Sequence, residues 1–125
     1  MTLSQESRRA LTRQYKDSTL PAGVFAIRNL KTGRVFAAAA LDIVGAMNRQ
    51  RFELNLRSHR NKALQHDWIA LGAEAFAFEE LARVKERDDP AFDRAAELEA
   101  LFELWAEESG CHGAQGYNGP ARPSA

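Results

Sequence analysis

The sequence predicts a small α+β domain in which a three-stranded, mainly antiparallel sheet is flanked by helices. Two observations favour this class. Segments in which β-forming residues alternate stand beside segments that carry apolar residues at helical spacing. In addition, a chain of 125 residues has room for only one modest hydrophobic core. We therefore expect a single domain rather than a two-domain enzyme.

The chain is expected to begin with a polar helix that is followed by a β-hairpin. Residues 1–21 predict a short helical extension, because Leu11 and Tyr15 lie four residues apart in a polar segment. The alternation in GVFAIRN, residues 23–29, predicts a strand. After a tight turn of sequence LKTG, RVFAAA at residues 34–39 predicts a second strand, so the two strands should pair as a hairpin.

Two helices are expected after the hairpin. One is predicted over residues 42–56, because its first residue is an aspartate, which suits the N-cap position. The other is predicted over residues 62–71, where Leu64, Trp68 and Leu71 fall on one helical face. A basic loop of sequence RSHRN joins the two helices.

A third strand and a last helix complete the expected order. Residues 73–84 predict the strand, with Phe76 and Phe78 on one side. The Asp-Asp-Pro sequence at residues 88–90 is predicted to begin the helix. The apolar stripe of this helix consists of Leu98, Leu101, Phe102 and Trp105.

The predicted elements divide the chain into a helical extension over residues 1–21, a domain over residues 22–118 and a disordered tail over residues 119–125. No apolar run is long enough to cross a membrane, and the polar start lacks the apolar segment of a signal peptide, so we expect a cytoplasmic protein. The single cysteine, Cys111, predicts neither a disulfide nor a zinc cluster.

Charge is divided unevenly along a chain whose formal net charge is zero. Residues 1–72 carry twelve Lys/Arg and five Asp/Glu, a net charge of +7, whereas residues 73–125 carry five and twelve, a net charge of −7. Two interpretations stay open. In the first, the basic half of the chain forms a face that contacts nucleic acid. In the second, the basic and acidic halves attract each other within the protein.

Two tripeptides in the predicted hairpin, Gly23-Val24-Phe25 and Phe36-Ala37-Ala38, lie where a known family carries its signature. With the later Gly116-Tyr117-Asn118, they resemble the GIY-YIG superfamily of DNA-cutting domains, whose two signature tripeptides are Gly-Ile-Tyr and Tyr-Ile-Gly. Further matches are Asn29, Gly33, the stretch from His59 through Asn61 and Leu64 to Gln65, Gly72 and Phe76. The resemblance covers about residues 22–118 and implies that family's α+β fold.

The resemblance also implies that the catalytic set is missing. Phe25 and Phe36 stand where the family has tyrosines, and a phenyl ring cannot exchange a proton. Ala46 replaces the arginine that steadies the phosphate, and Phe102 replaces the glutamate that binds the divalent metal. Only Asn118 is retained. We therefore expect a degenerate site with no cofactor, in which the family's Mg or Mn site is lost.

Displaced residues leave one enzymatic alternative open. Arg49 lies about one helical turn after Ala46, and Glu99 about one turn before Phe102, so a metal-dependent endonuclease with a rearranged site stays a rival interpretation. Against it, catalytic geometry tolerates little displacement. The family's layout further implies that Phe102 packs beside the two hairpin phenylalanines in a dry, converted site.

Basic residues gather on the hairpin, the first helix of the domain and the following loop, which in the resembling family border the DNA-facing surface. These candidates for phosphate contact are Arg28, Lys31, Arg34, Arg49, Arg51, Arg57, His59, Arg60 and Lys62. An ordinary solvated surface is the alternative explanation. The sequence thus predicts a non-catalytic binding or regulatory domain, with non-specific nucleic acid or a protein as the two classes of partner.

Overall fold

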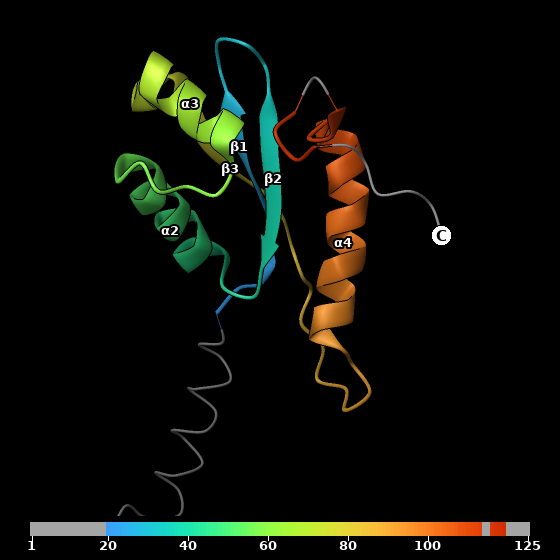
Figure 1. Ribbon diagram of the computed structural model, residues 1–125. Coiled ribbons are helices and arrows are strands. Elements are labelled where there is room, and N and C mark those ends of the chain that lie inside the picture. Colours follow the sequence, from blue (N-terminus) through green and yellow to red (C-terminus); the bar gives the residue numbers. More distant parts are fainter. Residues whose placement is uncertain (1–19, 114–115, 120–125) are drawn as a thin grey trace, which may run out of the picture.

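A computed structural model describes residues 20–113 and 116–119 of the chain (Figure 1). The predicted N-terminal helix and the predicted disordered tail lie outside these residues, apart from Leu20, Pro21 and Gly119. None of the helices within the described ranges is long and apolar enough to cross a membrane.

Three antiparallel strands form one open sheet. They are β1 (Gly23–Asn29), β2 (Val35–Ala40) and β3 (Phe76–Arg83), and β1 lies in the centre of the order β2-β1-β3. Both pairs are antiparallel, as predicted for the hairpin. The first strand matches its predicted bounds, and the second begins one residue later than predicted.

The third strand begins later than the sequence suggested. Ala73–Ala75 forms a short 3₁₀ helix, η1, instead of the first residues of a strand. The backbone at Gly72 has a φ of 87°, and the N–H of Ala75 donates to the Gly72 carbonyl at 3.1 Å. A turn closed by this bond keeps these alanines out of the sheet.

Helices α2 (Ile43–Asn55) and α3 (Lys62–Leu71) confirm the two helices predicted after the hairpin. Each begins at a polar cap. The Asp42 carboxylate accepts a backbone N–H in the first turn of α2 at 3.0 Å, and the Asn61 side-chain oxygen does the same for α3. These caps satisfy N–H groups that have no partner within the helix.

Helix α4 (Arg94–Ser109) begins beyond the Asp-Asp-Pro sequence that was predicted to open it. The carboxylate of Asp89 instead accepts the N–H of Ala91 at 2.9 Å, which closes a local turn at this point. Asp93 caps the helix by accepting a backbone N–H of the first turn at 3.1 Å. The prediction of the start was therefore wrong, because a second aspartate made the better cap.

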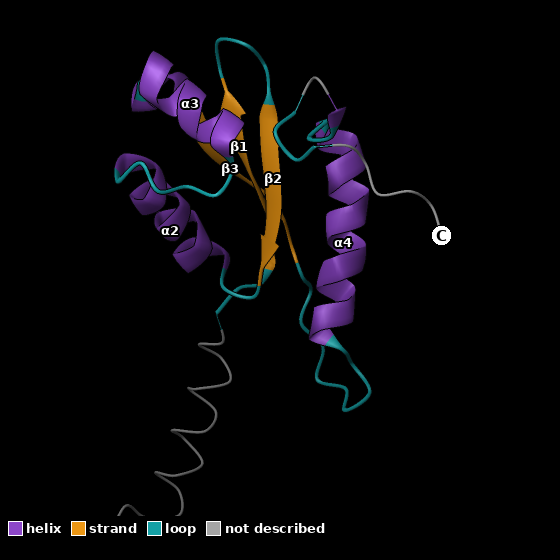
Figure 2. Cartoon of the chain, viewed as in Figure 1, coloured by secondary structure: helices purple, strands orange, loops and turns teal. Residues whose placement is uncertain are grey.

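The sheet lies between two helical layers, with α2 and α3 on one face and α4 on the other (Figures 1 and 2). Alternation along β1 sends Phe25 and Ile27 to the first face and Ala26 to the second. The first core also contains Ile43, Leu54, Leu64, Trp68, Phe76 and Tyr117. The larger apolar side chains thus gather under α2 and α3, and α4 packs on a surface of smaller residues.

Candidate functional site

Three of the predicted degenerate positions lie on the side of the sheet that α2 covers. Phe25 is 1% exposed inside the first core, and Ala46 on α2 is half-buried against the same core. Phe36 on β2 is also half-buried, and its ring meets the His59 ring edge to face with centroids 5.7 Å apart. The two hairpin phenylalanines therefore share a face but differ in their access to solvent.

Phe102 does not lie beside them, so the expectation that the three phenylalanines pack together is wrong. It is half-buried on α4 and packs against the cluster that contains Ala26, Ala37 and Cys111, on the opposite face of the sheet. The helical stripe correctly indicated which side of α4 faces the core, but it carried no information about which face of the sheet α4 would cover.

Asn118 completes the outer edge of β2. Its side-chain oxygen accepts the N–H of Ala37 at 2.9 Å, and its side-chain nitrogen donates to the carbonyl of Ala37 at 2.7 Å. The N–H of the preceding residue, Tyr117, donates to the Val35 carbonyl at 2.9 Å. The side chain of Asn118 thus takes the place of a neighbouring strand at one position of the edge.

Tyr117 joins the hairpin to α3 through its buried hydroxyl. The hydroxyl donates to the Asp67 carboxylate at 2.6 Å and accepts from the Asn29 side-chain nitrogen at 3.0 Å. Burial, followed by the hydrogen bond to Asp67, raises the pKa of Tyr117. The Arg34 guanidinium lies 4.2 Å above the Tyr117 ring and 3.4 Å from Asp67. Arg34 therefore serves the fold and is not available as a free surface cation.

An open depression of about 310 Å³ lies beside Phe36, on the α2 side of the β2 edge. Its lining consists of Phe36, Gln50, Glu53, His59, Arg60 and Asn61. Gln50 and Glu53 were not among the residues singled out from the sequence. They lie four and seven residues after Ala46 on α2, and this helical spacing is the signal that could have identified them.

His59 is held in one orientation at the wall of this depression. Its Nδ1 accepts the N–H of Asn61 at 3.0 Å, so the proton of the neutral ring belongs on Nε2, which contacts the side-chain oxygen of Gln50. Burial lowers the pKa of His59, and the nearby Glu53 carboxylate opposes this effect only in part. His59 is a neutral, structurally engaged side chain rather than a surface cation.

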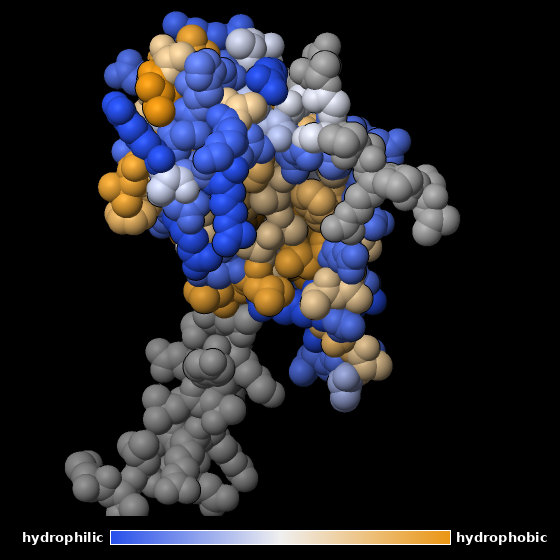
Figure 3. Space-filling view, viewed as in Figure 1, coloured by the Kyte–Doolittle hydropathy of each residue, from blue (hydrophilic) through white to orange (hydrophobic). Residues whose placement is uncertain are grey.

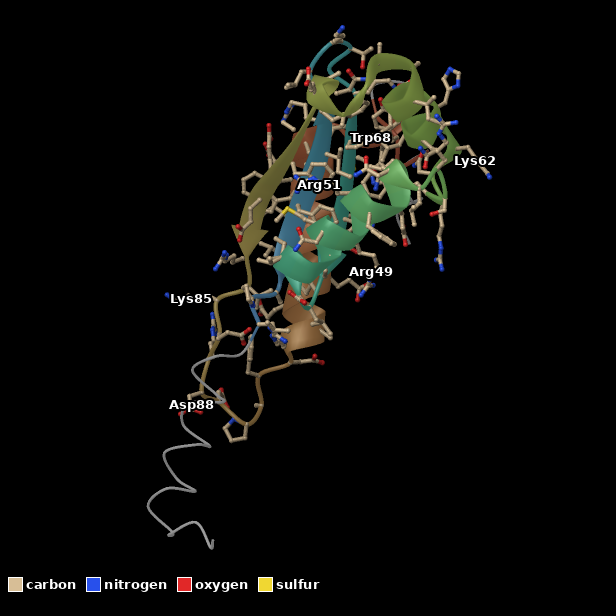
Figure 4. The ribbon with its side chains drawn as sticks, turned by 90° about the vertical axis from the view of Figure 1, so that its left-hand side faces the viewer. Arg49, Arg51, Lys62, Trp68, Lys85 and Asp88 are labelled. Carbon is tan, nitrogen blue, oxygen red and sulfur yellow. The ribbon has the colours of Figure 1, made fainter. Side chains whose placement is uncertain are left out.

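Two more of the predicted phosphate contacts are engaged in the fold. Arg28 points to the α4 side of the sheet, where its Nε lies 3.1 Å from the Glu79 carboxylate. The Arg51 guanidinium lies 4.5 Å above the ring of Phe78 on β3. Figure 4 shows Arg51 apart from Arg49 and Lys62, which lie on the other side of α2. The nine candidates therefore do not form one continuous surface.

The remaining cations are exposed. Lys31 lies in the hairpin turn. The other four come from α2, the α2–α3 loop and the first residue of α3, and we call them the basic track: Arg49, Arg57, Arg60 and Lys62. No salt bridge found within residues 20–113 and 116–119 involves any of them. Figure 3 shows a strongly hydrophilic band over the region of α2 and the α2–α3 loop.

The described residues offer few ligands for a divalent metal near the depression. In this part of the chain, no three His, Cys, Asp or Glu side chains group closely enough to hold an ion. Glu53 is the one carboxylate among the residues that line the depression, so any ion there would take most of its oxygen ligands from water or from a bound phosphate. The displaced pair considered from the sequence, Arg49 on α2 and Glu99 on α4, belongs to the same two helices that carry Ala46 and Phe102, so it stays an alternative.

No family model and no curated protein matches the chain in sequence. Among solved structures, the catalytic domain of the homing endonuclease I-TevI is similar, with a TM-score of 0.64 and 20% identity over 81% of this chain and 99% of that chain. A single-residue mutant of the I-TevI catalytic domain is also similar, with a TM-score of 0.62 and 20% identity over 79% of this chain and 93% of that chain. The chain therefore has the GIY-YIG-like fold that the I-TevI catalytic domain represents.

Proposed function

We propose that this domain binds the phosphate backbone of nucleic acid and does not cleave it. The observation that carries the proposal is the basic track, four exposed cations on one side of the molecule with no ion pair to any described residue. Cations that are not neutralised within the protein can replace the counterions of a polyphosphate. The nuclease fold of the structural neighbours makes nucleic acid a fitting partner for such a surface.

The opposite charge on the other side of the sheet favours one orientation of the partner. Helix α4 exposes five glutamates, which are Glu97, Glu99, Glu103, Glu107 and Glu108. These carboxylates repel a polyphosphate, so the partner should approach α2 and the α2–α3 loop. If all four cations of the basic track contact phosphates of a duplex, log K should fall with log salt with a slope of about −3.6.

The surroundings of the depression favour binding without chemistry. Phe36 presents a ring that carries no proton to transfer, and Phe25 is enclosed in the core. Both ring nitrogens of His59 already have hydrogen-bond partners, so this side chain is poorly placed to act as a general base. Ala46 and Phe102 carry no charge to stabilise a developing oxyanion or to hold a metal.

Charge reversal tests the proposed interface. Arg57→Glu combined with Arg60→Glu should lower the affinity for duplex DNA about tenfold or more at low salt, and equally on unrelated sequences. The matched control is Lys85→Glu combined with Arg87→Glu, an equal charge change on exposed residues of the β3–α4 loop. Fluorescence anisotropy with labelled duplexes measures both affinities.

The control keeps the test from reporting net charge alone. If the two double variants lose affinity equally, only the total charge matters and the proposed interface is wrong. Absence of binding by the parent at low salt would overturn nucleic-acid binding altogether. Thermal unfolding followed by circular dichroism establishes that each variant is folded before its affinity is compared.

A further inference from the structure

Apolar residues are exposed along one end of β2 and into the start of α2. Leu41 and Val44 are 51% and 47% exposed. Ala39, near the C-terminal end of β2, is also exposed. Half-buried Ala40 borders them. We call Ala39, Ala40, Leu41 and Val44 the β2 edge strip. Figure 3 shows apolar surface in this region, between the hydrophilic band and α4.

The backbone of the strip is open as well. Val35 and Ala37 direct carbonyl and N–H groups outward to Tyr117 and Asn118. Because strand backbone alternates, Ala39 directs its groups to the same side, and no hydrogen bond joins them to any residue that the structure describes. An open edge with apolar side chains is a surface that proteins normally cover.

Residues 116–119, which cover the first part of this edge, turn away before Ala39. Gly119 has a φ of 77°, a left-handed conformation that suits glycine, and its carbonyl accepts the N–H of Gly113 at 2.9 Å. This bond directs the chain back toward the end of α4. Among the residues that the structure describes, partners for the edge are thus found at Val35 and Ala37 and not beyond them.

We propose that residues 1–19 of the same chain cover the β2 edge strip. The first described residue, Leu20, lies beside the strip, because the Arg94 guanidinium donates to the carbonyls of both Leu20 and Leu41. The next carbonyl, that of Pro21, accepts the N–H of Ile43 at 2.9 Å. The N-terminal segment therefore joins the domain at one end of the surface that it would cover.

The segment is long enough to cover the strip. The six residues of β2 span about 20 Å. Nineteen residues reach about 28 Å as a helix and about 60 Å when extended. Leu11 and Tyr15 are the two large apolar residues of the segment nearest to Leu20 in sequence, and they supply the side chains to cover Leu41 and Val44.

Charge favours this occupant over a second copy of the domain. Residues 1–19 carry four Lys/Arg and two Asp/Glu, whereas α4, which flanks β2, carries five glutamates and one arginine. Opposite charges on the segment and the helix attract. Covalent attachment next to Leu41 also gives the segment a high effective concentration at the strip, an advantage that a second copy lacks.

The test compares two charge-matched variants of the full chain by NMR. Leu11→Glu combined with Tyr15→Glu should raise the hydrogen-exchange rate of the Ala39 amide about tenfold or more and shift the methyl signals of Leu41 and Val44. Thr12→Glu combined with Gln14→Glu adds the same charge to the same part of the segment and should leave the exchange rate of the amide near that of the parent.

Two outcomes overturn this inference. One is rapid exchange of the Ala39 amide in the parent and in both variants, which would mean that the strip is uncovered. The other is protection that rises with protein concentration and survives the change at Leu11 and Tyr15, which would identify a second copy as the occupant. Neither readout depends on nucleic acid, so failure here is distinct from failure of the proposed function.

Discussion

The two hairpin phenylalanines illustrate how the environment of a single residue decides what a change will do. Phe25 lies at the centre of the core under α2 and α3, where it is 1% exposed. Phe36 borders the open depression and packs edge to face on His59. A hydroxyl group added to the first ring enters an apolar core, whereas one added to the second can reach solvent.

Restoring the tyrosines one at a time should therefore give different results. Phe25→Tyr should lower the free energy of unfolding by about 1–3 kcal/mol, because its hydroxyl has no partner in the core. Phe36→Tyr should stay within about 0.5 kcal/mol of the parent. Urea unfolding measures both values. Equal midpoints for the two variants would show that the core around Phe25 holds a polar partner or water.

His59 should make the stability of the domain depend on pH. Its pKa is lowered by burial in the folded state, whereas the unfolded chain has the ordinary value of 6.5. The unfolded state therefore binds the proton more readily, so this contribution to stability is full above pH 6.5 and is lost as pH falls below it.

Urea unfolding at about pH 7.5 and about pH 5.5 measures this loss above the range in which carboxylates titrate. His59→Gln should remove much of the difference in unfolding free energy between the two pH values. His66→Gln, at an exposed position on α3, is the control and should retain it. If the His59 variant keeps the full difference in unfolding free energy, His59 is not the source of the pH dependence.

Among the elements, α4 was predicted as a helix, but the sequence did not show which face of the sheet it covers. Alternation predicted β1 and β2, the capping aspartate Asp42 predicted α2, and apolar spacing predicted α3, because these signals are local. The apolar stripe of α4 likewise predicted a helix with a buried side. The face of the sheet that α4 covers depends on contacts between Phe102 and residues of β1 and β2 far away in sequence, and no local pattern records them.

Local sequence signals likewise predicted only part of the candidate interface. Basic residues in the α2–α3 loop are exposed, as a polar loop sequence suggests. Arg28, Arg34 and Arg51 had the same sequence signal, yet they contact Glu79, Asp67 and Phe78 from distant segments. The sequence identifies which residues are cations. Only the tertiary fold shows whether a cation already contacts another side chain of the protein.

The packing of α4 leads to a prediction about Phe102. Phe102→Glu should lower the free energy of unfolding by about 1.5 kcal/mol or more, because it removes an aromatic ring from the α4 contact and brings a carboxylate toward an apolar cluster. Ala46→Arg should cost less than about 1 kcal/mol, since a long side chain can extend its charge to solvent. Urea midpoints in the reverse order would contradict this account of the α4 interface.

At the scale of the whole molecule, most of the charge separation along the sequence persists in the fold. Four ion pairs are found in the described part of the chain, and one of them, between Arg28 and Glu79, joins the basic first half to the acidic second half. The other three lie within one half each. Mutual neutralisation of the halves therefore accounts for little of the polarity, which leaves the basic track available to an external polyanion.

The same arrangement predicts that the protein does not cut DNA. Phosphodiester hydrolysis in a metal-dependent nuclease needs a side chain that holds the ion and a cation that stabilises the developing charge, and a displacement of about 1 Å from the productive geometry can cost about a hundredfold in rate. Here Ala46 on α2 and Phe102 on α4 stand at the positions that the resemblance assigns to the arginine and the metal-binding glutamate, and neither side chain carries a charge. Supercoiled plasmid incubated with the protein and magnesium or manganese should show no nicking above the buffer control.

The protein's own carboxylates provide the decisive control for that assay. Nicking that co-purifies with the chain and disappears in Glu53→Ala would mean that the depression beside Phe36 holds a metal after all. Nicking that disappears in Glu99→Ala would mean that α4 supplies a ligand across the β2 edge. Either result overturns a non-cleaving role, whereas activity that persists equally in both variants identifies a contaminating nuclease, because a metal site here would depend on at least one of these side chains.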